Sequence, residues 1–165
     1  MIQIRERDLS ARQLCSVIGS AGESANILVN DRADVAASSA AGVHLTTRSM
    51  PVDVVRAAFG SQILMGASTH TIDEVEAAEA GGADFVVFGP VFETPSKLEY
   101  GAPVGLDALA QVATRSRIPV LALGGVNLSN YKRALDAGAA GVAGISMFIE
   151  VMDLAALVAE IKAYA

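Results

Sequence analysis

The sequence has a single cysteine, Cys15, among its 165 residues. One thiol cannot form an intramolecular disulfide, so a disulfide-stapled scaffold is excluded. Cys15 lies in a helical pattern, and we expect it to pack as a small core residue. Basic residues are also scarce: 12 Lys and Arg face 18 Asp and Glu, which gives a formal net charge of −6. A chain with that balance and no Lys/Arg run is not expected to bind nucleic acid.

Long apolar runs are missing as well. No run approaches the ~18 residues that suggest a membrane span. The N-terminus has no basic region followed by an apolar one, which is the pattern of a signal peptide. We therefore expect a cytoplasmic protein with no membrane partner. The sequence leaves the oligomeric state open, a homo-oligomer included.

Short apolar segments are what the sequence has in abundance. Hydrophobic residues make up 52% of the chain, in stretches that Gly, Asp and Arg interrupt, as is typical of strands buried on both faces. Seven stretches predict strands. They are Ile2–Arg5, Ile27–Asn30, Gly42–Leu45, Leu64–Ser68, Phe85–Gly89, Val120–Gly124 and Gly141–Ser146.

The segments between the predicted strands have helical spacing. Leu106, Leu109, Ala110 and Ala113 follow i, i+3, i+4, i+7 and share one helix face. Residues 71–74, Thr-Ile-Asp-Glu, form a capping box that starts a helix ending at Ala80. Gly81 follows in the position where a glycine ends a helix.

One type of junction recurs along the chain and indicates repeated αβ units. Residues 40–43, 80–83 and 137–140 each close a helix with Ala and Gly and enter a strand. Strands that alternate with helices favour a parallel sheet. We predict one domain over residues 1–165, an α/β (β/α)₈ TIM barrel that lacks its first β-strand and helix, since a closed barrel needs eight units. The alternative is an open α/β sheet with fewer strands.

In such barrels the site lies where each strand meets the following helix. After the first predicted strand, period 2 puts Gln3, Arg5 and Arg7 on one side. Guanidinium groups suit phosphate or carboxylate, so these residues are candidate substrate ligands. The alternative for Arg7 is a solvated position at the rim.

Asn30 and Asp31 follow the second predicted strand directly. The Asn30 amide suits hydrogen bonds to a heterocycle, and the Asp31 carboxylate suits Mg²⁺. Asp31 could equally cap the helix that starts near Ala33.

Two histidines stand near the ends of the next strands. We expect His44 to be a packed or hydrogen-bonded strand residue and Ser68 to face the mouth of the barrel. His70 is the best candidate for general acid/base work near neutral pH, with a surface turn as the alternative.

Residues 88–103 form the longest predicted loop, and long loops at a barrel mouth tend to be functional. Thr94, Ser96 and Lys97 offer hydroxyl groups and a cation to an anionic ligand.

Glycines end the last two predicted strands, at Gly124-Gly125 and within residues 141–146. Glycine lets backbone N–H groups approach a ligand closely, so these strand ends predict a phosphate cup, with a small phosphorylated substrate as its occupant. The alternative is that the glycines serve tight turns only.

These motifs, in this order, resemble the thiamine phosphate synthase/TenI family along nearly the whole chain. The motifs that carry the resemblance are residues 3–8, 30–32, 42–45, 68–70, 88–97 and 124–125. The synthase branch joins a pyrimidine diphosphate to a thiazole phosphate with Mg²⁺. The resemblance implies pyrimidine and diphosphate contacts for Gln3, Arg5, Asn30 and Ser68, and thiazole phosphate on Gly125 with the backbone of Ile145 and Ser146.

Two departures from the family pattern bear on the reaction. Ser49 stands where the synthase pattern has a second Mg²⁺-binding Asp, and a hydroxyl is a poor substitute on a hard cation. The Ile4–Arg7 string and Phe92-Glu93-Thr94 resemble the TenI branch, whose members can tautomerise a thiazole phosphate instead.

Pro90 in turn replaces the catalytic His of the characterised tautomerase, which leaves His70 as the base. Pro90 counts against a tautomerase, but Ser49, the Arg7-containing motif and the phosphate cup together favour a TenI-like tautomerase that binds thiazole phosphate. The first alternative is a Mg²⁺-dependent synthase, and the second is a non-catalytic binder of thiazole phosphate.

Overall fold

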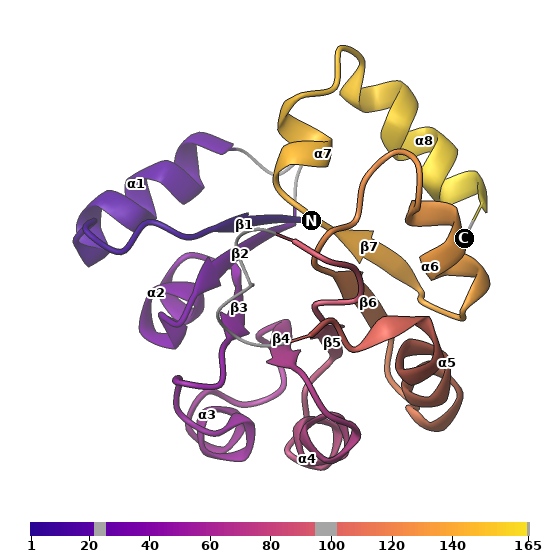
Figure 1. The fold of residues 1–165 in the computed structure, drawn as a ribbon. Helices are drawn as coiled ribbons and strands as arrows, with labels where there is room; N and C mark the ends of the chain where they lie inside the picture. Colours follow the sequence, from indigo (N-terminus) through magenta and orange to yellow (C-terminus); the bar gives the residue numbers. More distant parts are fainter. Residues whose placement is uncertain (22–25, 95–101, 165) are drawn as a thin grey trace. The chain divides into compact units, whose positions relative to one another are not determined.

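The computed structural model describes residues 1–21, 26–94 and 102–164 (Figure 1). The chain divides into two compact units, which are described separately. Unit 1 comprises Met1–Ser68 with Ala77–Asp84, and unit 2 comprises Thr69–Glu76 with Phe85–Ala165.

Among the described residues, seven short strands alternate with helices, and five pairs of neighbouring strands are parallel. The strands are β1 (Ile2–Ile4), β2 (Ile27–Asn30), β3 (Gly42–Leu45), β4 (Met65–Thr69), β5 (Phe85–Phe88), β6 (Val120–Leu123) and β7 (Gly141–Ala143). Their hydrogen-bonded order is their order in the chain. The predicted α/β class with parallel strands is confirmed.

The helices follow the strands along the chain. They are α1 (Ala11–Ala21), α2 (Ala33–Ser38), α3 (Val52–Phe59), α4 (Ile72–Ala80), α5 (Gly105–Arg115), α6 (Tyr131–Asp136), α7 (Ser146–Ile149) and α8 (Leu154–Tyr164). No helix among the described residues is both long and apolar enough to cross a bilayer.

Unit 1 packs its helices on strands β1 to β4 through two apolar clusters. One cluster centres on Leu14 and Val29, and the other on Val43 and Met65. Cys15 lies at the edge of the first cluster, half-buried, where its Sγ accepts a hydrogen bond from Ser39 Oγ at 3.2 Å. Cys15 thus packs against the core as predicted, but it is only partly buried, whereas Leu14 and Ile18 are the buried residues of α1.

The start of β4 is held by a polar clamp in unit 1. Asp84 Oδ2 accepts the Met65 N–H at 2.6 Å and an Arg56 N–H at 2.8 Å. Arg56 also donates to the carbonyl oxygens of Gly60, Gly82 and Ile63. This clamp fixes the strand whose far end carries Ser68.

Unit 2 places helices α5 to α8 around β5 to β7. Leu109 and Val112 are the buried residues of α5, which confirms the predicted helix. Helix α8 lies beside α6 (Figure 1), and Tyr131 Oη donates to Glu160 Oε1 at 2.6 Å. The core here gathers Val126, Leu135, Met147 and Ile161 among others.

The three recurring junctions share one geometry. Each has a residue of positive φ, namely Ala40, Gly82 or Gly138. In each, the following N–H donates to a carbonyl five residues back, as in a Schellman motif. The residue that ends α4 in this way is therefore Gly82 at φ 91°, and the prediction of Gly81 was one position early.

Candidate functional site

Gln3 and Asn30 meet where β1 and β2 end in unit 1. Gln3 Nε2 donates to Asn30 Oδ1 at 3.0 Å. The pairing is possible because the two strands are parallel and in register at Gln3 and Leu28, so Asn30 lies further toward the carboxyl end. It leaves Gln3 Oε1 as an acceptor and Asn30 Nδ2 as a donor, a combination that suits the edge of a heterocycle.

Arg5 and Arg7 lie beyond the end of β1. The strand stops at Ile4, one residue earlier than predicted, and both arginines are exposed. Among residues 1–21, 26–94 and 102–164, neither arginine forms an ion pair. Two guanidinium groups without a carboxylate partner are available to an anion.

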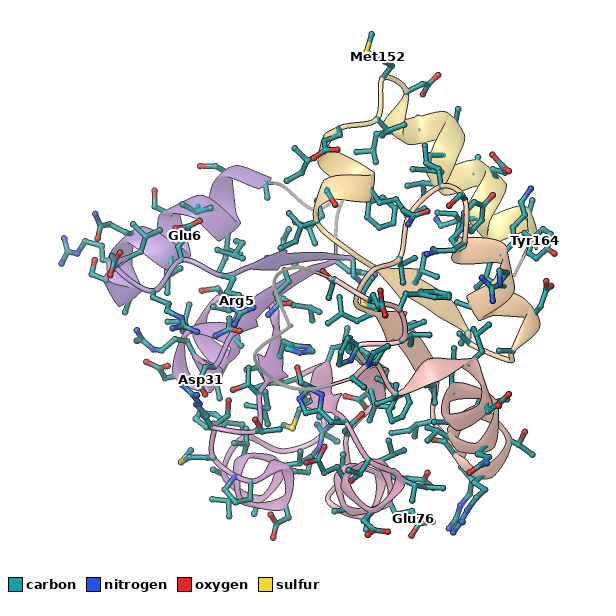
Figure 2. All side chains as sticks on the ribbon, in the orientation of Figure 1. Arg5, Glu6, Asp31, Glu76, Met152 and Tyr164 are labelled. Carbon is teal, nitrogen blue, oxygen red and sulfur yellow. The ribbon has the colours of Figure 1, made fainter. Side chains whose placement is uncertain are left out.

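Asp31 adopts an unusual backbone conformation at the end of β2. Its φ is 63°, in the left-handed region that a non-glycine residue rarely adopts, and its N–H donates to His44 O at 2.9 Å. Helix α2 has Arg32 as its N-cap and no side-chain cap bond, so the alternative that Asp31 caps this helix is wrong. Figure 2 shows the exposed side chains of Asp31 and Arg5 near α2.

His44 and Ser68 form a second polar pair in unit 1. His44 is 4% exposed, and its Nε2 lies 2.8 Å from Ser68 Oγ. Burial, with a smaller contribution from the positive charge of Arg5, lowers the pKa of His44 to about 4. The ring is therefore neutral at pH 7 and holds the Ser68 hydroxyl. This confirms that His44 is a hydrogen-bonded strand residue.

Ser49 closes a turn after β3. Its Oγ accepts the Thr46 N–H at 2.8 Å and lies 3.1 Å from Thr46 Oγ1. No described residues form a group of three or more His, Cys, Asp or Glu that could hold a metal. Asp31 alone fits Mg²⁺ only together with oxygen atoms from a phosphorylated substrate and water, which is a common mode for this ion.

His70 lies at the start of α4, in unit 2. Its Nδ1 lies 2.5 Å from Gly89 O, and because a carbonyl only accepts, Nδ1 carries the proton. The neutral ring then has its lone pair on Nε2, the form a general base needs. Glu74 Oε2 accepts the His70 N–H at 2.5 Å. Only half of the predicted capping box is therefore present, Thr71 Oγ1 with the Glu74 N–H.

The loop after β5 is laid against the end of β6. Val91 N–H donates to Leu123 O at 2.8 Å, and Phe92 N–H donates to Gly124 O at 2.9 Å. Thr94 is half-buried in this loop. Ser96 and Lys97, the other two predicted ligands, lie outside the described residues.

Gly124 and Gly125 follow β6 with φ of 93° and 66°. A Cβ at Gly124 would come within 2.4 Å of Pro90, and one at Gly125 within 2.4 Å of Glu93 O. Both positions therefore require glycine, because the loop after β5 packs directly against the backbone of Gly124 and Gly125. No described residue accepts a hydrogen bond from the Gly125 N–H.

The second side of the predicted cup comes from the segment after β7. This strand ends at Ala143, earlier than predicted, because helix α7 begins at Ser146. Ile145 and Ser146 are exposed, and neither N–H donates to a described acceptor. Unit 2 thus offers several free backbone donors at the ends of β6 and β7.

Sequence reasoning missed two residues in the β6–α6 loop. Asn130 Nδ2 donates to Gly125 O at 2.9 Å, and Asn127 Nδ2 donates to the same oxygen at 3.2 Å. Asn127, two residues after the glycine pair, and Asn130, directly before the helix, were the available signals.

Comparison with known proteins gives a consistent result. A family model described as thiamine monophosphate synthase matches residues 1–148. A protein of Geobacter sulfurreducens named putative thiamine-phosphate synthase is 48% identical over 158 residues, which cover 92% of this chain and 74% of the relative. The thiamine-phosphate synthase of Moorella thermoacetica is 38% identical over 161 residues, which cover 94% of this chain and 77% of the relative.

A solved structure, the thiamine phosphate pyrophosphorylase from Pyrococcus furiosus, superposes with a TM-score of 0.83 at 29% identity. The match covers 98% of this chain and 80% of that chain.

Proposed function

The chain belongs to the thiamine monophosphate synthase (TMP-TENI) family, and on that premise we propose that it is a thiamine phosphate synthase, joining a pyrimidine diphosphate to a thiazole phosphate. The Gln3–Asn30 amide pair carries this proposal, because it is preorganised for a heterocycle that a tautomerase would not bind. Relatives with synthase names support it too. The tautomerase, which the sequence favoured, becomes the second candidate.

Unit 1 would bind the pyrimidine diphosphate. Gln3 Oε1 and Asn30 Nδ2 would face the pyrimidine edge, with the Ser68 hydroxyl as a third contact. Arg5 and Arg7 would take the diphosphate through charge-assisted hydrogen bonds. Asp31 would hold Mg²⁺ together with substrate oxygens, and this ion would neutralise the diphosphate as it leaves.

Unit 2 would bind the thiazole phosphate. Backbone N–H groups of Gly125, Ile145 and Ser146 would take the phosphate, with Gly124 giving the loop its close turn. Thr94, Ser96 and Lys97 would contact substrate oxygens. In the reaction, the carbon–oxygen bond to the diphosphate breaks and the thiazole nitrogen forms the new bond to that carbon.

The test is product formation from both substrates, with and without Mg²⁺. We expect Mg²⁺-dependent thiamine phosphate formation. Gln3→Ala should raise the KM for the pyrimidine diphosphate about tenfold, because one contact to the heterocycle and the hydrogen bond that orients Asn30 are lost together. Gln111→Ala, an exposed amide on α5, is the matched control and should change nothing. No product at any Mg²⁺ concentration would refute the synthase proposal.

The second candidate, a TenI-like tautomerase, rests on Ser49 in place of the Asp and on the His70 ring, whose Nδ1–H is fixed by Gly89 O. Its test is turnover of the thiazole carboxylate phosphate tautomer. His70→Gln should abolish turnover if Nε2 is the base, and unchanged turnover would overturn that role. Tight thiazole phosphate binding without turnover in either assay would instead identify a non-catalytic binder.

A further inference from the structure

Two asparagine side chains converge on one carbonyl oxygen beside the proposed phosphate cup. Asn130 Nδ2 and Asn127 Nδ2 donate to Gly125 O at 2.9 and 3.2 Å. We propose that Asn130, assisted by Asn127, is a positioning residue that aims the backbone N–H donors of this loop at the phosphate. The inference deepens the proposed function and rests on it for the identity of the phosphorylated ligand.

The peptide planes on both sides of Gly125 are held. In a trans peptide the C=O and the following N–H point in opposite directions. Phe92 N–H fixes Gly124 O, so the Gly125 N–H points away from the β5 loop. The asparagine amides fix Gly125 O, so the next plane cannot rotate either. The Phe92 bond therefore sets the direction of the Gly125 N–H, and the asparagine bonds set the direction of the Val126 N–H, before any ligand arrives.

The Asn130 side chain bonds the Gly125 carbonyl and does not cap helix α6. It is the N-cap of α6, a position where an Asn side chain normally accepts an N–H of the helix's first turn. Here it makes no cap hydrogen bond. Its Oδ1 accepts the Asn127 N–H at 2.8 Å while its Nδ2 reaches Gly125 O. The amide carries its donor and its acceptor on two separate atoms, so it can make both bonds at these two places in the loop.

Asn127 is itself oriented by the loop. Ser129 donates to Asn127 Oδ1 from its backbone N at 2.9 Å and from its Oγ at 2.6 Å. With Oδ1 occupied, the Nδ2 group must face Gly125. Gly125 has a left-handed φ of 66°, and glycine has more backbone freedom than any other residue, so its carbonyl can rotate if the two asparagine bonds are lost.

The test compares a phosphorylated and an unphosphorylated ligand by calorimetric titration. We expect Asn130→Ala to bind thiazole phosphate and inorganic phosphate about five- to tenfold more weakly, the effect of about one hydrogen bond. Affinity for the unphosphorylated thiazole alcohol should stay within about twofold. Asn130→Ser is a second variant, because Ser suits an N-cap and preserves helix α6 but is too short for Gly125 O.

Leu128→Ala is the matched control, since Leu128 is 59% exposed in the same loop, and it should bind like the native chain. The amide NMR signal of Val126, whose N–H lies in the peptide plane that Asn130 holds, provides a second readout. It should move on phosphate addition in the native chain and move less in Asn130→Ser.

The outcomes separate this inference from the proposed function. Native phosphate affinity in both Asn130 variants, or equal losses for the phosphorylated and unphosphorylated ligands, would overturn the positioning role. If the native chain binds inorganic phosphate but not thiazole phosphate, the proposed function fails, and the Asn130 comparison still decides this role with inorganic phosphate. Absence of both affinities in the native chain would overturn both proposals.

Discussion

At the scale of single residues, His44 shows how burial decides a role. Its type alone is compatible with a metal ligand, a base or a strand residue. Burial and the nearby Arg5 keep it neutral, and a neutral ring can hold Ser68 without carrying charge into the core. The sequence predicted this packed role, but it contained no sign that Ser68 is the partner, since the two residues are 24 positions apart.

The depressed pKa of His44 predicts a loss of stability in acid. The pKa is about 4 in the folded chain and 6.5 in the unfolded one, so the unfolded state binds more protons in between. This contribution is complete above pH 6.5 and is lost as the pH falls toward 4. The gap corresponds to at most about 3 kcal/mol. Urea unfolding at pH 7 and pH 4 measures it.

His44→Gln is the comparison for that prediction. An amide can still bond Ser68 but does not titrate, so the variant should lose less stability between pH 7 and pH 4 than the native chain. Parallel stability curves for the two proteins would contradict the assignment to His44.

Ser49 allows a prediction about metal affinity. An Asp at this position can accept the Thr46 N–H as Ser49 does, and it adds a carboxylate. We expect Ser49→Asp to lower the Mg²⁺ concentration for half-maximal synthase activity about tenfold. The free energy of that change is a small share of the electrostatic attraction between a carboxylate and a divalent cation. Ser49→Asn has the same shape without the charge and serves as the control. Equal Mg²⁺ dependence in the two variants would exclude a metal near residue 49.

At the scale of elements, the strands were predicted better than their ends. The stretches at 27–30 and 42–45 are confirmed residue for residue. The last strand was predicted through Ser146 but ends at Ala143. The residues that follow were predicted to continue the strand, whereas Ile145 is the N-cap of helix α7, which begins at Ser146. Local composition does not separate these outcomes.

The recurring junctions make a stability prediction at this scale. Ala40 occupies the left-handed position, with φ 53°, that glycines fill at the other two junctions. A Cβ in that conformation costs about 1–2 kcal/mol, so we expect Ala40→Gly to raise the free energy of unfolding by about 1 kcal/mol. Chemical denaturation measures the change.

Ala57→Gly provides the control for Ala40→Gly. Ala57 is exposed within α3, where glycine should lower stability by about 0.5–1 kcal/mol. A loss of stability in Ala40→Gly of similar size would mean that backbone strain at residue 40 is not relieved by glycine.

At the scale of the whole molecule, the sequence located the strand ends that carry polar groups but not the bonds among them. Two hydrogen-bonded pairs illustrate this. The pair of Gln3 and Asn30 exists only once β1 and β2 are in register, and the pair of Asn127 and Gly125 exists only once the turn after β6 is closed. A motif specifies residue types in order, whereas a hydrogen bond depends on side-chain direction. The residues that orient the site were therefore less predictable than the candidate ligands beside them.

The last prediction concerns which segments of the chain each substrate protects from hydrogen exchange. Hydrogen exchange with mass spectrometry should show that thiazole phosphate protects the segments around Gly125 and around Ile145–Ser146. At a concentration 100 times its Kd, protection should reach about 100-fold, the mass-action limit for opening that requires ligand release. Pyrimidine diphosphate with Mg²⁺ should instead protect residues 3–7, 30–31 and 68.

Each ligand serves as the control for the other, because each set of segments lies within one unit of the chain. Protection of 3–7 and 30–31 by thiazole phosphate alone would mean that unit 1 was assigned the wrong ligand. In Asn130→Ala, the protection of the Gly125 segment should disappear while the protection around Asn30 persists. This result would trace the phosphate contact to the loop that Asn127 and Asn130 hold.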